Sequence, residues 1–191
     1  MRLTVYCGSS LGRRPEYATA VRRLGREMVA RGFSLVYGGA AVGLMGVLAD
    51  TVLAAGGEAV GVIPRLLVAR EIAHAGLSEL RVVETMHERK ALMAELGDGF
   101  VALPGGAGTF EELFEAFTWA QLGLHTKPCA VLNAGGYFDL LLQLLRHAVD
   151  EGFMRDESAR MLIAESEPDR LLTRLAAHQP VPAKWAPRQR D

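Results

Sequence analysis

The 191-residue sequence lacks the features of secreted and membrane proteins. Only two cysteines are present, Cys7 and Cys129, and both lie in short apolar runs, where cysteine usually packs as a small hydrophobic residue. No run of about 18 apolar residues could span a bilayer, and the apolar part of the N-terminal MRLTVYCGSS is too short for a signal peptide. We therefore expect a cytoplasmic protein that does not bind membranes.

The sequence also lacks an excess of charge of either sign. Its formal net charge is −1, which gives no positive field for nucleic acid or for an anionic membrane surface. The histidines share no metal-ligand spacing, so we expect no metal ion, and no other cofactor is predicted. Any phosphate that the protein binds must be met by local donors.

Apolar residues are abundant, and they follow two alternating patterns. Half of the residues are hydrophobic and 23% are charged, which is typical of a globular domain with a full core. Strand-like runs occupy residues 3–7, 34–37, 59–63, 80–83, 99–103 and 129–132, with a further candidate at 160–164. Segments of helical period occupy residues 15–31, 43–55, 86–97, 109–123, 137–151 and 168–177. This order predicts an α/β fold, a single-domain, doubly wound (Rossmann-like) parallel sheet flanked by helices, over residues 1–178, followed by an irregular tail over 179–191.

Three loops rich in glycine or small hydroxyl residues follow predicted strands. They are CGSSLG after the first strand, YGGAAVGLMG after the second and PGGAGT after the fifth. In doubly wound sheets, ligands bind beyond the carboxyl ends of the strands, where the strand order reverses. The candidate phosphate ligands in these loops are Ser9, Gly38, Gly39, Gly105, Gly106, Gly108 and Thr109.

These loops do not match two common phosphate-binding fingerprints. The dinucleotide pattern requires G-x-G-x-x-G after the first strand and an acidic residue about 20 positions later. The first loop reads GSSLG, and the second strand ends in VYG without an acid. The G-x-x-x-x-G-K-[ST] loop of nucleotide triphosphatases is absent from the sequence as well. The loops therefore indicate a site for one phosphate or one mononucleotide.

The stretch PGGAGTFEE joins a glycine loop to a helix predicted to start near Thr109. Free N–H groups and the dipole at a helix N-terminus favour an anion, although a plain β–α turn is the alternative explanation. Glu112 is either a catalytic carboxylate or part of a Thr109-x-x-Glu112 capping box that only satisfies the N-cap amide. The helix is apolar on more than one face, with Phe117, Trp119 and Leu122, which favours deep burial or a subunit interface.

The stretch ETMHERKALMAELG predicts another helix, whose polar residues differ in role. Thr85 and Glu88 have the spacing of a capping box, so Glu88 is expected to be structural. Arg89 falls on the apolar stripe that also carries Met93. Because arginine is seldom buried without a partner, Arg89 requires an anion, either a protein carboxylate or a ligand. Lys90 is expected to be solvated unless a ligand reaches it.

Two of these stretches resemble motifs of the LONELY GUY (LOG) proteins, cytokinin riboside 5′-monophosphate phosphoribohydrolases formerly labelled lysine decarboxylases. PGGAGTFEE is similar to the family's P-G-G-x-G-T-x-x-E motif, and MHERK to its companion. The likeness extends over most of the chain, through YCGSS, VYGGAAVGLMG, GVIP, FTWAQLG and DEGF. One departure is Ala40, where the family often has a third glycine.

The resemblance implies a nucleotide-binding hydrolase that cleaves the N-glycosidic bond of a nucleoside 5′-monophosphate, such as a cytokinin ribotide or AMP, and releases free base and ribose 5-phosphate. By the family's pattern, Arg89 and Glu112 are the catalytic pair. Substrate contacts carry over to Glu71, Arg89, Lys90, Gly106, Ala107, Gly108, Thr109, Phe110, Glu111, Glu112 and Thr118. A homodimer is also implied, with a helix completing the neighbouring site. The alternative is a non-catalytic carrier of a nucleotide or of the molybdenum cofactor, which would not need Arg89 and Glu112 together.

Overall fold

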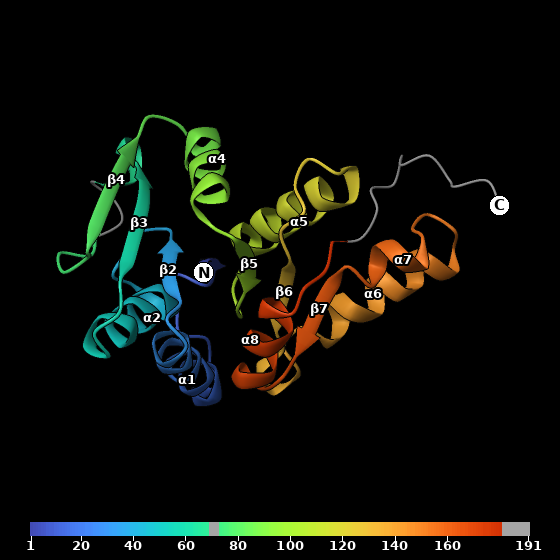
Figure 1. Ribbon diagram of the computed structural model, residues 1–191, viewed down its shortest axis with the longest axis horizontal. Helices are drawn as coiled ribbons and strands as arrows, with labels where there is room; N and C mark the ends of the chain where they lie inside the picture. The colour runs from blue at the N-terminus through green and yellow to red at the C-terminus, as the bar shows by residue number, and fades with distance from the viewer. Residues whose placement is uncertain (69–72, 181–191) are drawn as a thin grey trace.

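Within residues 1–68 and 73–180, which the computed structural model describes, seven strands form one sheet (Figure 1). The strands are β1 (Arg2–Tyr6), β2 (Ser34–Tyr37), β3 (Ala59–Pro64), β4 (Glu79–Val83), β5 (Gly99–Ala102), β6 (Cys129–Leu132) and β7 (Leu162–Glu165). Their order is β4-β3-β2-β1-β5-β6-β7, and every pairing is parallel. The predicted doubly wound α/β fold is confirmed.

Helices cover both faces of the sheet and bury two separate apolar clusters. One cluster lies under α1 (Pro15–Ala30), α2 (Gly43–Ala54) and α8 (Pro168–Ala176), and the other under α4 (Met86–Leu96), α5 (Ala107–Leu122) and α6 (Asp139–Asp150). Every residue of β3, β5 and β6 is buried, which is why these strands read as continuous apolar runs. In the described part of the chain, no helix has both the length and the apolar character needed to cross a bilayer.

The predicted boundaries of these strands and helices lie within two residues of those in the structure. Three short helical segments were not predicted: α3 (Arg65–Val68), the 3-10 turn η1 (Ala134–Gly136) and α7 (Asp156–Ala159). The segments η1 and α7 are too short to show a hydrophobic period, which needs a window of about 11 residues or more. The tail predicted for 179–191 falls outside the described residues from residue 181 onward.

The strand order reverses between β1 and β5, which are neighbours in the sheet although they are far apart in the chain. The Leu103 N–H donates to the Tyr6 carbonyl oxygen at 2.9 Å, and the Gly8 N–H donates to the Pro104 carbonyl oxygen at 3.0 Å. A Cβ at Gly8 would lie 3.2 Å from the Cα of Gly105, so glycine lets the two loops run side by side. Ligand crevices of doubly wound sheets open at such a reversal.

Helix α4 is seated on the sheet by a buried threonine. The Thr4 hydroxyl, on β1, donates to the Met93 carbonyl oxygen of α4 at 2.7 Å. A Cβ at Gly97, which ends α4, would overlap that hydroxyl, so the helix approaches the strand closely only because residue 97 is glycine. Lys127 Nζ donates to the Ala94 carbonyl oxygen at 2.6 Å near the same end of α4. These contacts set the position of α4 above β1.

Candidate active site

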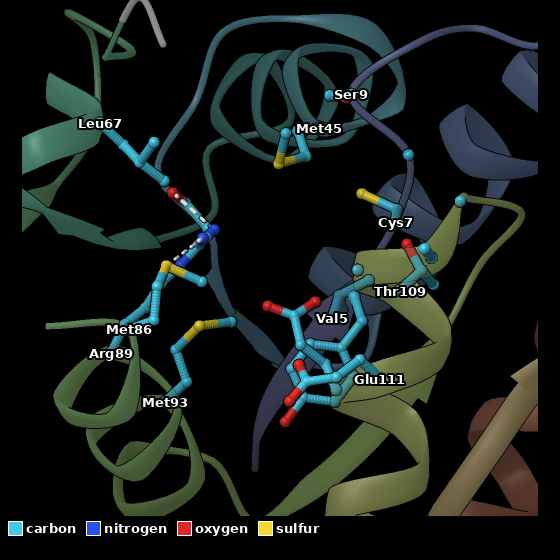
Figure 2. Close-up of a pocket in the computed structure, with 17 residues that line it drawn as sticks. Val5, Cys7, Ser9, Met45, Leu67, Met86, Arg89, Met93, Thr109 and Glu111 are labelled. Atoms are coloured by element: carbon cyan, nitrogen blue, oxygen red, sulfur yellow. Dashed lines mark hydrogen bonds between the residues drawn. The ribbon is translucent and has the colours of Figure 1, made fainter. Parts of the chain in front are cut away.

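A cavity of about 340 Å³ opens at the crevice beyond β1 and β5 (Figure 2). Its volume is in the range of small-molecule sites. On one side α4 contributes Met86, Arg89 and Met93, and on the other side α5 contributes Thr109 and Glu111 (Figure 2). The loop after β1 and the start of α2 close the space between these two walls. The cavity therefore collects residues from all three of the loop regions that the sequence singled out.

The N-terminus of α5 presents open backbone to this cavity. The helix begins at Ala107, two residues before the predicted start, and its N-cap Gly106 makes no side-chain hydrogen bond. The first N–H groups of a helix have no partner within the helix, and the helix dipole adds partial positive charge there. A Cβ at Gly106 or at Gly108 would project into open space. The two glycines thus leave room for an anion to reach the amides.

Gly105 is constrained by packing rather than by a ligand. A Cβ at this position would overlap the Thr109 hydroxyl and lie 2.8 Å from the Gly8 nitrogen. The Tyr137 hydroxyl donates to the Gly105 carbonyl oxygen, which further fixes the loop. Gly105 therefore supports the shape of the loop before α5 and does not line the cavity.

The two predicted capping boxes have different outcomes. Thr85 is the N-cap of α4 and accepts from the Glu88 N–H at 3.1 Å, as predicted. The Glu88 carboxylate accepts from the Glu84 N–H at 3.0 Å, one residue before the N-cap, so Glu88 has the structural role expected of it. Thr109 is not an N-cap, because α5 begins at Ala107. Glu112 is consequently released from a capping role and lines the cavity.

Arg89 is a buried cation without a protein counter-ion among the described residues. Its side chain is only 7% exposed. Nη2 donates to the Gly38 carbonyl oxygen at 3.3 Å, Nη1 contacts the Met86 sulfur at 3.9 Å, and Nε has no partner. The sequence left two alternatives for the anion that Arg89 requires, a protein carboxylate or a ligand. Within residues 1–68 and 73–180, no carboxylate forms an ion pair with Arg89. Because an unpaired buried charge is costly, the geometry favours an anion that enters the cavity.

Burial raises the pKa of the Glu112 carboxyl to about 7. The positive charges of Arg89 and Lys90 lower this pKa, while the carboxylates of Glu111 and Glu115 raise it. A group with a pKa near 7 populates both protonation states at neutral pH, as a general acid or base must. The cavity therefore contains a titratable carboxyl on one wall and an uncompensated guanidinium on the other.

Lys90 is not solvated, so that expectation was wrong. Its side chain is 9% exposed, and its ammonium group forms ion pairs with Glu111 and, at 3.1 Å, with Glu115. The Glu111 hydrogen bond, which is the larger cause, and the Glu115 contacts raise the pKa of Lys90 although burial opposes them. Lys90 does not line the cavity, whereas its neighbour Arg89 does.

Some of the remaining candidate residues line the cavity, and others lie elsewhere in the structure. Ser9, Gly38, Gly106, Ala107, Gly108, Thr109 and Glu111 line the cavity. Gly39, Gly105, Phe110 and Thr118 do not. Phe110 packs against Tyr137 and Phe138, and Thr118 is exposed on α5. Glu71 lies outside the described residues.

Several wall residues were not anticipated from the sequence. Cys7, Met45, Leu67, Met86 and Met93 all contribute apolar surface to the cavity (Figure 2). Met86 and Met93 share the helical stripe that identified Arg89, so the same period could have found them. Leu67 lies on α3, which was not predicted. Within the described ranges, no three histidine, cysteine or acidic side chains are grouped so that they could hold a metal ion.

Solved structures similar to this chain share its fold at low sequence identity. The molybdenum cofactor binding protein from Rippkaea orientalis aligns with a TM-score of 0.70 and 19% identity, over 92% of this chain and 95% of that one. The molybdenum cofactor carrier protein from Chlamydomonas reinhardtii aligns with a TM-score of 0.69 and 18% identity, over 93% and 98% of the two chains. At such identities the likeness shows the fold alone.

Sequence comparison identifies much nearer relatives. Residues 45–175 match the family described as "Possible lysine decarboxylase". The chain is 46% identical to the cytokinin riboside 5′-monophosphate phosphoribohydrolase LOG of Oryza sativa subsp. japonica, over 94% of this chain and 74% of that protein. It is also 46% identical to the enzyme LOG7 of Arabidopsis thaliana, over 94% and 82% of the two chains. The chain therefore belongs to the family of the cytokinin riboside 5′-monophosphate phosphoribohydrolases.

Proposed function

We propose that the protein hydrolyses the N-glycosidic bond of purine nucleoside 5′-monophosphates, such as cytokinin ribotides or AMP, and releases free base and ribose 5-phosphate. The observation that carries the proposal is the pairing of two features in one cavity. An open helix N-terminus and the unpaired Arg89 attract an anion, and Glu112 faces the same space. The names of relatives with 46% identity over 94% of the chain support the same reaction.

In this proposal, the substrate phosphate binds at the start of α5. Ser9, Ala107, Gly108 and Thr109 line the cavity there, and the first amides of α5 have no partner within the helix. Glu112 follows Ala107 by five positions, which corresponds to about 7.5 Å along the helix axis. This distance suits a ribose that extends from a phosphate at the helix N-terminus toward the carboxylate. The apolar wall that contains Met45 would then face the base.

Glu112 acts on the sugar as the base departs. Breaking the bond between C1′ and the base nitrogen leaves an oxocarbenium-like ribose, which a nearby carboxylate stabilises. The same carboxylate can deprotonate the water whose oxygen bonds to C1′, so that overall water adds hydroxide to the sugar and a proton to the base. Arg89 holds the phosphate, the carboxylate or both. Binding energy from the phosphate, which does not react, is used for orientation.

Two other activities are less consistent with these residues. A carrier of a nucleotide or of the molybdenum cofactor needs no carboxyl with a pKa near 7 opposite a buried arginine. A decarboxylase that forms an imine needs a lysine with a depressed pKa. The pKa of Lys90 is raised, chiefly by its hydrogen bond to Glu111, and Lys127 donates to carbonyl oxygens of α4.

The active form is proposed to be a homodimer. Leu122, Leu124 and Phe153 are 42%, 69% and 87% exposed at the end of α5 and after α6. Gln121 and Phe153 line one surface pocket, which brings these two segments together. Exposed apolar residues that cluster in this way mark an interaction surface. Thr118 lies one helical turn before Leu122 and outside its own cavity, so its expected substrate contact would be made in the partner's site.

Replacing Glu112 by glutamine is expected to lower kcat/KM for AMP or N6-isopentenyl-AMP by roughly 10²–10³-fold or more, because the carboxylate that stabilises the transition state is lost. Release of free base is measured by chromatography, and AMP binding by calorimetry. The matched control is Glu95→Gln, an exposed glutamate on α4, which is expected to behave like wild type. Unchanged base release by Glu112→Gln would remove this residue from the mechanism.

The specificity constant kcat/KM, which reports the free enzyme, is expected to rise with pH through a midpoint near 7. Glu112 has a raised pKa of about 7, so it is protonated and inactive below that value and ionised above it. At pH 6, kcat/KM should therefore be about tenfold below its plateau. A flat profile between pH 5.5 and 8.5, measured with stable protein, would contradict the assignment.

Adenosine is expected to be a poorer substrate than AMP by about 100-fold or more in kcat/KM, because it has no phosphate to anchor at the start of α5. Parallel assays of both compounds with the same enzyme preparation measure this ratio. Equal turnover of the two would refute the phosphate site.

Phe153→Asp is expected to convert a dimer into a monomer, because it places a charge in the proposed apolar interface. Analytical ultracentrifugation measures the change. Val82→Asp, at a 44% exposed position on the edge strand β4, is the control and should sediment like wild type. A wild-type protein that is monomeric at micromolar concentration would contradict the dimer.

A further inference from the structure

Each of the two helices that form the cavity walls carries two consecutive charged residues, positive on α4 and negative on α5. Arg89 and Lys90 are neighbours on α4, and Glu111 and Glu112 are neighbours on α5. Consecutive residues on a helix point about 100° apart, because the helix has 3.6 residues per turn. Arg89, Glu111 and Glu112 line the cavity, whereas Lys90 does not. Lys90 and Glu111 form an ion pair with each other, and no ion pair within the described residues includes Arg89 or Glu112.

The closed pair contains a third member. Lys90 also pairs with Glu115 at 3.1 Å, and Glu111 and Glu115 are four residues apart on the same face of α5. Like charges at this spacing repel each other and destabilise a helix. The side chain of Lys90 is 9% exposed, whereas those of Glu111 and Glu115 are 55% and 27% exposed. A single buried ammonium group therefore pairs with two carboxylates and links α5 to α4.

Glu112 lies within the influence of all of these charges. Besides its burial, the charges of Arg89 and Lys90 lower the pKa of Glu112, and those of Glu111 and Glu115 raise it. Without Lys90, two uncompensated carboxylates would stand next to the carboxyl that must ionise. The same two carboxylates would also lose their link to α4.

The groups facing Glu112 from β1 do not change charge in the same pH range. Burial, followed by the glutamates of α5 and Cys129, raises the pKa of Tyr6 well above its ordinary value. Burial, followed by Glu112, raises the pKa of the Cys7 thiol. Both side chains stay neutral near pH 7. The charge balance around Glu112 is therefore set by α4 and α5.

We propose that Lys90 is a positioning residue for Glu112 rather than a ligand of the substrate. By holding Glu111 and Glu115 against α4, it keeps Glu112 turned to the cavity and able to ionise near neutral pH. This role rests on the proposed function in so far as Glu112 acts on the substrate. It replaces the substrate contact that the family resemblance implies for Lys90.

The test is a titration of Glu112 in the free protein, read from its ¹³C carboxyl resonance and assigned by its loss in Glu112→Gln. Lys90→Met is expected to raise the titration midpoint by roughly 0.5–1 pH unit, because it removes a nearby positive charge. Lys90→Arg should restore the wild-type midpoint. Lys90→Met/Glu111→Gln/Glu115→Gln should bring it to the wild-type value or below, since the two carboxylates that pair with Lys90 and raise the pKa of Glu112 are gone as well.

Two further variants keep the result interpretable. Glu111→Gln/Glu115→Gln retains Lys90, and its midpoint should fall below that of wild type, which tests the same balance if Lys90→Met does not fold. Lys127→Met removes a lysine that also supports α4 but pairs with no glutamate in the described chain, and its midpoint should stay at the wild-type value.

Kinetics with AMP separate positioning from substrate binding. With Lys90→Met, kcat/KM at pH 7 is expected to fall roughly 2–6-fold in step with the shifted midpoint of the free enzyme, while KM changes less than about twofold. A rise in KM with the midpoint unmoved would overturn the proposal and restore Lys90 as a substrate ligand. If the wild type releases no base from AMP, the proposed reaction fails, but the carboxyl titration still decides the role of Lys90.

Discussion

The site depends on one buried positive charge that the described part of the protein leaves without a carboxylate partner. Arg89 is 7% exposed, and its guanidinium group makes one hydrogen bond to a main-chain carbonyl oxygen. Such an arrangement is unfavourable in an empty cavity and becomes favourable when an anion enters. The fold maintains it because α4 is fixed to β1 through Thr4 and Gly97, so the guanidinium cannot easily move to solvent.

The reversal of strand order brings this charge to a second anion-attracting element. The loops after β1 and β5 meet through the Gly8–Pro104 hydrogen bond, and α5 starts immediately beyond it. The cation on α4 and the open amides of α5 therefore face one small volume. Glu112, in the second turn of α5, lines that volume, and burial raises its pKa to about 7. One topological feature thus positions the binding elements and the acid together.

The strands, the long helices and the burial of Arg89 were predictable from the sequence. The features that were missed depend on contacts between helices or on the residue at which a helix begins. Strand and helix periods located β1 to β7 and the long helices, and the stripe on α4 correctly placed Arg89 on a buried face. The ionic partners of Lys90 were missed because a lysine beside a stripe looks solvated unless the neighbouring helix is known. The alternatives for Glu112 could not be separated, since a capping box depends on the residue at which the helix begins. Leu67 was missed because no helix was predicted directly after β3, where α3 carries it.

The position of the Arg89 guanidinium depends on the absence of a side chain at Gly38. A Cβ at position 38 would overlap the Arg89 guanidinium, whose Nη2 is bonded to the carbonyl oxygen of that same residue. Even alanine would therefore push the cation away from the main chain and change what the cavity attracts. Among related sequences, the residue aligned with position 38 can serve as a simple marker: a glycine there is compatible with this placement of the arginine, and any larger residue signals a rearranged pocket.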